Sequence, residues 1–383
     1  MKKIILIIAV LCYGVLAEAI DVFVAGKEKT DWRKKSDEPH YCKYREQNVV
    51  QTKSGRIVVV CQGRNKSSWC DRSGQDLVVK TSDDNGRTWS PVRLVVTHGN
   101  HSICPNAIVY DREKNCIHLL YNLITWDYKN PPHKGELNDF NCVQYTIISN
   151  DEGETWSKPK DVSDMVGAGG SIVVFGSGEG IQLEKGKHKG RLIVAGGDFH
   201  KGKKVLCFYS DDHGATWKRG NPVPIKGQAV LASETKVAEL PDGTIVLNSR
   251  TFLGGKKGQR LRSRSYSKDG GVTWLPLEND PAMKTVSCNG SLIAVKHPKG
   301  KDGTVLLCSV PVGPNRTHGT IYTSFDNGQT WPVKNMVVPE YFAYSSLLQF
   351  ADGRIALFYE AEEYKKIKMA LFSLDELLEG KHE

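Results

Sequence analysis

Long apolar runs are missing from this 383-residue sequence after about residue 20. No later stretch is long enough to cross a bilayer as a helix, so we expect no transmembrane segment. Helix-length segments with a 3.6-residue period are also rare, whereas glycine is frequent, with 37 residues. These features favour a β-rich chain with many turns.

An extreme charge and the spacings of metal sites are missing as well. Lysine and arginine outnumber the acids by 52 to 43, a formal charge of +9 that only mildly favours acidic partners. No Cys-x-x-Cys occurs, and no His/Cys pair has metal-ligand spacing. We therefore expect no nucleic-acid partner, no metal and no organic cofactor.

The first 19 residues have the pattern of a secretory signal peptide. A basic start at Lys2 and Lys3 precedes an apolar stretch, and Ala17-Glu18-Ala19 has the small-x-small form of a cleavage site. We expect residues 1–19 to be removed and residues 20–383 to form one domain, either secreted or periplasmic.

Ten cysteines are present, one of them, Cys12, inside the predicted signal peptide. The odd number that remains leaves at least one thiol unpaired. Because a chain of this length can build a core without cross-links, we expect most cysteines to be small buried strand residues. One or two disulfides are expected, with a connectivity that the sequence does not reveal.

One pattern, Ser-x-Asp-x-Gly-x-Thr-Trp, occurs five times at intervals of roughly 57–67 residues, a period typical of propellers and solenoids. Its copies begin at Ser82, Ser149, Ser210, Ser267 and Ser324. Ser and Asp side chains can hydrogen-bond to turn backbone, and Gly supplies a positive φ. Each copy therefore predicts a hairpin turn whose tryptophan packs on a neighbouring strand.

Short strands are predicted between the copies, for example at residues 56–61, 191–195 and 244–248. Four short strands per repeat make one propeller blade. The span from about 35 to 375 thus predicts an all-β, six-bladed β-propeller, closed by the strand Ile367 to Phe372. Calcium binding by the repeats is the weaker interpretation, because one Asp per turn supplies too few oxygens.

The repeats resemble the Asp boxes, or BNR repeats, of the sialidase superfamily, and the resemblance covers nearly the whole chain after residue 20. Asp boxes also occur in propellers without activity, so the residues between them are more specific. The stretch from Gly176 to Leu183, followed by Gly190 to Val194, is similar to the family's third blade. The resemblance implies a non-viral exo-α-sialidase that acts on sialylated glycans, glycoproteins or glycolipids.

Sialidases bind the sialic acid carboxylate with three arginines from different blades, and this sequence resembles them at Arg45, Arg250 and Arg316. Guanidinium groups suit this task because they keep their proton and bind carboxylates bidentately. The resemblance further implies that Arg64, nineteen residues after Arg45, contacts the 4-hydroxyl of the sugar.

Three further residues match the catalytic positions of the family. Tyr344, 28 residues after Arg316, corresponds to the nucleophile, and Glu234, sixteen residues before Arg250, to its base. Asp71 matches the loop acid/base, one or two residues later than usual. A tyrosine with a pKa near 10 is a poor nucleophile, but a carboxylate can take its proton and nearby arginines favour its phenolate. The implied reaction retains configuration through a tyrosine nucleophile, as in other sialidases.

Competing interpretations exist for several of these residues. Glu239 competes with Glu234, and Tyr341 with Tyr344, but an odd offset along a strand places each pair on opposite faces. Asp71 can also be a simple turn former, and each arginine a surface or ion-pair residue. The same site can also belong to a trans-sialidase, an intramolecular trans-sialidase or a glycan-binding propeller without activity.

The sequence departs from the family at three places. Glu46-Gln47 follows Arg45 where the family commonly has Ile-Pro, and we expect Glu46 to face away from Arg45. Cys104 precedes Pro105 where the family often has Asp or Asn, which leaves a sialidase for deaminated sialic acid open. Asn315 heads an N-glycosylation sequon that includes Arg316, and a glycan there would block the cleft.

Overall fold

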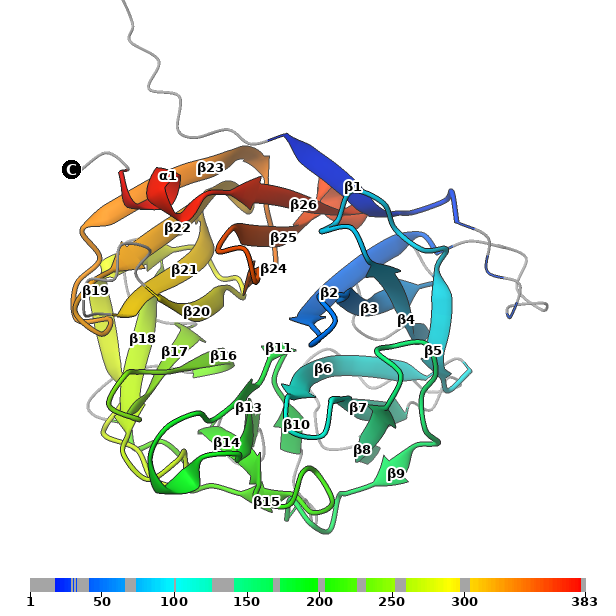
Figure 1. Cartoon of the computed structure of the whole chain (residues 1–383), viewed down its shortest axis with the longest axis horizontal. Helices are drawn as coiled ribbons and strands as arrows, with labels where there is room; N and C mark the ends of the chain where they lie inside the picture. Colours follow the sequence, from blue (N-terminus) through cyan, green and yellow to red (C-terminus); the bar gives the residue numbers. More distant parts are fainter. Residues whose placement is uncertain are drawn as a thin grey trace, which may run out of the picture.

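Six β-sheets surround a central axis in a computed structural model of the chain (Figure 1). The structure describes residues 18–28, 30, 32, 41–65, 74–99, 101–125, 141–167, 173–198, 204–225, 232–251, 260–296 and 304–379. The predicted all-β, six-bladed propeller is confirmed. The predicted signal peptide, apart from its last two residues, and Asp71 lie outside the described residues.

The first three blades are antiparallel meanders whose first strand lies nearest the axis. Blade 1 contains β2 (Lys43–Gln51), β3 (Ile57–Arg64), β4 (Gln75–Ser82) and β5 (Arg93–Thr97). Blade 2 contains β6 (Ser102–Asp111), β7 (Cys116–Thr125), β8 (Asn141–Ser149) and β9 (Lys160–Asp161). Blade 3 contains β10 (Val173–Phe175), β13 (Leu192–Asp198), β14 (Lys204–Ser210) and β15 (Lys218–Arg219).

The remaining blades follow the same plan. Blade 4 contains β16 (Ala232–Glu239), β17 (Ile245–Thr251), β18 (Arg260–Ser267) and β19 (Glu278–Thr285). Blade 5 contains β20 (Ser291–Lys296), β21 (Thr304–Gly313), β22 (Thr317–Ser324) and β23 (Val333–Tyr341). Blade 6 contains β24 (Ser345–Gln349), β25 (Ile355–Ala361), β26 (Lys366–Phe372) and β1 (Ala19–Val24).

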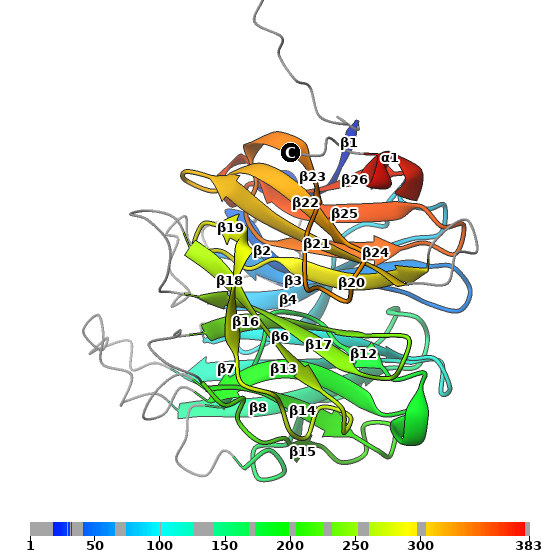
Figure 2. The ribbon, with the colours of Figure 1, turned by 90° about the vertical axis from the view of Figure 1, so that its left-hand side faces the viewer.

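The ring is closed by its N-terminal strand. Strand β1 pairs antiparallel with β26 and is the outermost strand of blade 6, and Figure 2 shows the two strands together at one edge of the molecule. The prediction that Ile367 to Phe372 closes the ring was therefore wrong, because this segment is the third strand of its blade. The expected domain boundary at residue 20 falls inside β1.

Blades pack face to face, which explains why their middle strands are apolar on both sides. Every residue of β3 is buried, as expected for a strand covered by a neighbouring blade on each face. A short detour interrupts this regularity in blade 3. There β11 (Gly178–Glu179) pairs in parallel with β6 of blade 2, and β12 (Ile181–Gln182) then returns to β13.

The five repeats form equivalent turns between the third and fourth strands of blades 1 to 5. In the first copy, Gly86 N–H donates to the Ser82 hydroxyl at 2.9 Å. The Asp84 carboxylate accepts from the Thr88 N–H at 2.9 Å and from the Thr88 hydroxyl at 2.6 Å. The other four copies make the same bonds. Because third strands run parallel to first strands, these turns lie on the face where the first strands end.

The described cysteines form no disulfide with one another. Of these eight cysteines, six are buried, mostly in strands. The expected burial is therefore confirmed, whereas the expected disulfides are not found in the part of the chain that the structure describes. No helix in this part has the length and apolar composition needed to cross a membrane.

Closure by β1 can be tested at Phe23, whose side chain is fully buried and whose ring centroid lies 5.0 Å from that of Tyr44 in blade 1. Phe23→Ala removes this contact and should lower the free energy of unfolding by about 3–5 kcal/mol, the usual cost of a buried Phe→Ala change. Chemical denaturation measures it. Phe325 is 47% exposed and serves as the control, with an expected change within about 0.5 kcal/mol for Phe325→Ala. Equal, small changes in both variants would contradict a stabilising role for β1.

Candidate active site

Five of the predicted site residues converge on one face of the propeller. Arg45 and Glu234 lie near the starts of the innermost strands β2 and β16, and Arg250 lies near the end of β17. Arg316 lies in the turn between β21 and β22, and Tyr344 immediately precedes β24. First strands begin and second strands end on this face, so it is opposite to the face that carries the Asp boxes.

Glu234, Arg250 and Tyr344 form a connected group at this face. Arg250 Nη1 lies 2.7 Å from each carboxylate oxygen of Glu234 and 3.4 Å from the Tyr344 hydroxyl. The Tyr344 hydroxyl in turn donates a short hydrogen bond to Glu234 Oε1. The hydroxyl of Ser287 accepts from Arg250 Nη2 at 2.9 Å and fixes the far side of the guanidinium.

The pKa values of this group assign its protons. Burial raises the pKa of Glu234. The charge and the hydrogen bond of Arg250 lower this pKa, as do a hydrogen bond from Tyr344 and the charge of Arg316. Together they outweigh burial, so the pKa lies below its ordinary value. Burial and then the charge of Glu234 raise the pKa of Tyr344 well above its usual range, although Arg250 and Arg45 lower it. The arginines therefore favour the phenolate as expected, but burial and the charge of Glu234 outweigh them. Tyr344 is a neutral phenol beside an ionised glutamate.

The other two arginines surround the same tyrosine. The guanidinium carbon of Arg45 lies 4.9 Å from the centroid of the Tyr344 ring, and that of Arg316 lies 5.5 Å from it. Arg45 Nε also bonds to Glu360 Oε1 at 3.0 Å. Arg316 Nη1 donates to the hydroxyl of Tyr364 at 2.9 Å. The structure thus brings together three guanidinium groups, a phenol and a carboxylate from four blades.

Glu360 holds this arrangement and was missed from the sequence. Its fully buried carboxylate accepts from Arg45, from the Glu46 N–H at 2.9 Å and from the Tyr344 N–H at 3.1 Å. Its backbone N–H also donates to the Tyr344 carbonyl at 3.0 Å. A signal existed in the sequence, because Glu360 is an acid that directly follows the apolar run Ile355 to Tyr359 and lies in the same strand.

The expectation that Glu46 faces away from Arg45 assumed a regular strand, but Glu46 lies at an irregularity of β2. The pairing of β2 with β3 shifts register between Arg45 and Asn48, and Glu46 has a φ of 54°. This bulge breaks the alternation of a regular strand and buries the carboxylate. Ser177 donates to it at 2.9 Å, and Arg64 Nη2 lies 3.4 Å from it.

The remaining predicted residues differ in their surroundings. Arg64 is fully buried and donates to Gln62 Oε1 at 2.7 Å, so its contact with a sugar hydroxyl stays a prediction. The role of Asp71 also stays a prediction, because this residue is outside the described part of the chain. Glu239 accepts from the backbone N–H groups of Glu184 and Lys185, away from Glu234. Tyr341 packs edge-to-face on Tyr364.

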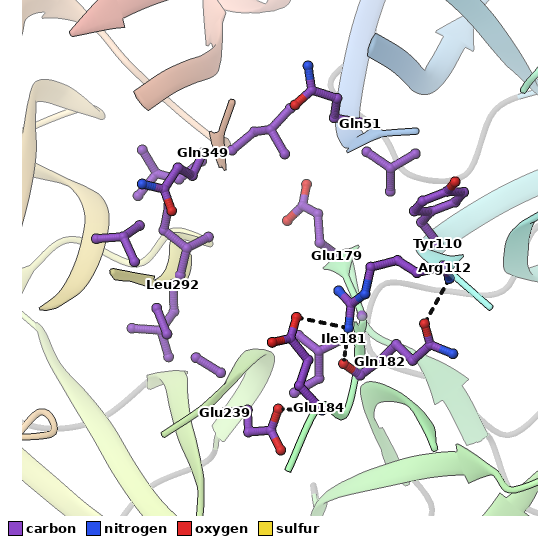
Figure 3. A pocket seen from close by; sticks show the side chains of 18 of the residues that line it. Gln51, Tyr110, Arg112, Glu179, Ile181, Gln182, Glu184, Glu239, Leu292 and Gln349 are labelled. Atoms are coloured by element: carbon purple, nitrogen blue, oxygen red, sulfur yellow. Dashed lines mark hydrogen bonds and ion pairs between the residues drawn. The ribbon is translucent and has the colours of Figure 1, made fainter. Parts of the chain in front are cut away.

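A cavity of about 920 Å³ opens at the other end of the axis, and Figure 3 shows part of its lining. Its rim is formed where innermost strands end, at residues such as Gln51, Glu239 and Gln349, and Glu179 points into it. The cavity therefore lies opposite the arginine cluster and contributes none of its residues. Its size alone does not make it the active site, because Arg112 is the single arginine among its described lining residues and is ion-paired with Glu184.

One group of side chains has the composition of a metal site. Asp111, Cys116 and His118 place a ligand atom each within 4.8 Å of one another, although the sequence spacing of Cys116 and His118 did not predict a metal site. The Asp111 carboxylate, however, already accepts from two backbone N–H groups of its turn, from Gln182 and from His213. This pattern fits a buried turn cap, and the group is separate from the arginine cluster.

The chain matches the family model described as a BNR repeat-like domain over residues 71–357. It is 31% identical over 339 residues to a sialidase of Micromonospora viridifaciens, covering 83% of this chain and 50% of that protein. It is 28% identical over 347 residues to a sialidase of Bacteroides fragilis, covering 83% of this chain and 60% of that protein. The chain thus spans about half to three fifths of the length of these relatives.

The fold is similar to that of the intramolecular trans-sialidase of Ruminococcus gnavus in complex with oseltamivir carboxylate. The TM-score is 0.74 at 20% identity, and the match covers 88% of this chain and 96% of that one. This likeness concerns the fold, whereas the BNR match and the sequence relatives concern the family. The chain therefore belongs to the sialidase family of BNR-repeat propellers.

Proposed function

We propose that the chain is an exo-α-sialidase that hydrolyses terminal α-ketosidic bonds of sialylated glycans, glycoproteins or glycolipids with retention of configuration. The observation that carries the proposal is the group of three arginines around a tyrosine that is hydrogen-bonded to an ionised glutamate. The names of the two sequence relatives support the same substrate class. With the predicted signal peptide, the enzyme would act outside the cytosol.

Arg45, Arg250 and Arg316 bind the carboxylate of the sialic acid in this proposal. Each of the three is at least half buried, and charge attraction is stronger there than in water. Planar guanidinium groups can each offer two N–H donors to one carboxylate. A substrate bound in this way places its anomeric carbon, which carries the carboxylate, beside Tyr344.

Tyr344 attacks this anomeric carbon in the first step. Its O–C bond forms while the glycosidic C–O bond breaks, and Glu234 accepts the phenol proton through the hydrogen bond already present. A neutral phenol suits the step better than a free anion, because the substrate carboxylate would repel an anion. The raised pKa of Tyr344 supports a proton transfer that occurs with attack rather than before it.

Asp71 completes the reaction as acid and then base. It protonates the leaving oxygen in the first step and takes a proton from water in the second, while Glu234 returns its proton to Tyr344. Two inversions at the anomeric carbon give net retention. The intermediate can also pass to a sugar acceptor or to a hydroxyl of the sialic acid itself. Product analysis by nuclear magnetic resonance separates hydrolysis from both kinds of transfer.

Substitutions at the three catalytic positions should have different signatures with two substrates. General-acid catalysis raises the reaction rate by about 10²–10⁴-fold, and its contribution is largest for a poor leaving group. Asp71→Ala should therefore reduce kcat/KM strongly for an alkyl sialoside and far less for an aryl sialoside with an acidic phenol. Tyr344→Phe and Glu234→Gln should slow formation of the intermediate from both substrates alike. Equal losses on both substrates in Asp71→Ala would exclude this residue as the acid.

The ionisation of Glu234 can be tested through protein stability. Glu239, on the same strand, is the control, because its pKa is shifted in the opposite direction. The pKa of Glu234 is lowered in the fold, so its contribution to stability is present above the ordinary glutamate pKa and disappears as the pH falls below it. Burial raises the pKa of Glu239 despite bonds from Glu184 and Lys185, so its folded form binds protons above that ordinary value.

Unfolding free energies should therefore change in opposite ways with pH. Below about pH 4.3, the ordinary glutamate pKa, Glu234→Gln should lose less stability per pH unit than the wild type. Above that pH, folded Glu239 takes up a proton as the solution is acidified, and this uptake stabilises the wild type. Glu239→Gln lacks this gain, so its stability should fall more steeply with decreasing pH than that of the wild type. Urea denaturation across this range measures both slopes. A Glu234→Gln slope equal to that of the wild type would argue against an ionised base at position 234.

A further inference from the structure

The hairpin between β25 and β26 contains an unusual backbone segment. Glu362, Glu363 and Tyr364 have φ values of 49°, 53° and 74°. It is the longest run of non-glycine residues with positive φ in the described part of the chain. Such conformations are costly for L-residues and persist only where the surroundings impose them, often at functional sites.

This backbone directs the Tyr364 side chain into the arginine cluster. The guanidinium carbon of Arg45 lies 4.3 Å from the centroid of the Tyr364 ring. Since the Tyr344 ring lies 4.9 Å from the same carbon, Arg45 contacts two tyrosine rings. The Tyr364 hydroxyl accepts from Arg316 Nη1 at 2.9 Å. One side chain thus contacts two of the three arginines.

A tyrosine is well suited to hold arginines that must also bind an anion. Its ring face attracts a guanidinium through the quadrupole of the ring, and its hydroxyl oxygen accepts an N–H. Neither contact adds a full negative charge. A carboxylate at the same place would neutralise part of the cluster and compete with an anionic ligand. Tyr364 can therefore orient Arg45 and Arg316 and leave the positive charge of the site intact.

We propose that Tyr364 is a positioning residue that holds Arg45 and Arg316 in the orientation needed to bind a substrate carboxylate. The proposal rests on the proposed function, because it takes the arginine cluster as the carboxylate site. Tyr341 packs against this ring in an edge-to-face contact, with the two ring centroids 5.5 Å apart.

Two substitutions separate the ring from the hydroxyl. Tyr364→Phe keeps the ring and removes the acceptor for Arg316, so binding of a carboxylate ligand should weaken by about 3- to 10-fold. Tyr364→Leu removes both contacts, and binding should weaken by about 10- to 100-fold. For a sialoside substrate, KM should rise by a larger factor than kcat falls.

The probe is the unhydrolysable 2,3-didehydro-2-deoxy analogue of sialic acid, compared with its methyl ester by calorimetry. The wild type should prefer the acid to the ester, and both variants should reduce this preference. A merely structural defect would weaken the two ligands equally. Tyr209→Leu is the matched control, because Arg191 lies 4.2 Å from the Tyr209 ring in blade 3, and it should leave the preference unchanged.

The outcomes distinguish this inference from the proposed function. If the wild type turns over sialosides but both variants keep its preference for the acid, the positioning role is overturned. If Tyr364→Leu fails to fold, Tyr364→Phe still decides the question. If the wild type binds the acid in a Tyr364-dependent way but hydrolyses no sialoside, the proposed function fails and the positioning role stands.

Discussion

The buried carboxylate of Glu360 is the contact on which the candidate site depends. It joins the guanidinium of Arg45 to the backbone N–H groups of Glu46 and Tyr344, and these three residues come from the two blades that meet where the ring closes. A buried charge is tolerated only when it is paired and hydrogen-bonded, so each partner requires the others. The first arginine and the tyrosine are thereby fixed relative to one another across a blade boundary.

Ring closure is the second requirement for this contact. Blade 6 supplies Tyr344 and Glu360, and its outer strand is the N-terminal β1, whose Phe23 packs against Tyr44 of blade 1. The remaining arginines come from blades 4 and 5, next in order around the ring. A propeller whose blades are packed rigidly can hold the three positively charged arginines close together with little loss of folding free energy. The Asp boxes contribute only indirectly, because their turns lie on the opposite face.

Much of this architecture could be predicted because its signals are local. Each Asp box contains its own hydrogen-bonding groups, and the spacings from Glu234 to Arg250 and from Arg316 to Tyr344 reflect the lengths of one or two strands. Closure by β1 could not be predicted, because its partner β26 lies at the other end of the chain. The orientation of Glu46 depends on a bulge, and that of Tyr364 on three left-handed residues. The protonation of Tyr344 depends on burial, which a spacing does not reveal.

The most direct test of the account is mass spectrometry of the enzyme during turnover of a 3-fluoro sialoside with a good leaving group. The fluorine slows both chemical steps, while the leaving group restores the first, so a covalent intermediate should accumulate. The account predicts that the protein gains the mass of one fluorosialosyl group, that peptide mapping finds it on Tyr344, and that Tyr344→Phe does not acquire it. A sialosyl group on another residue, or rapid turnover of ordinary sialosides by Tyr344→Phe, would contradict the account.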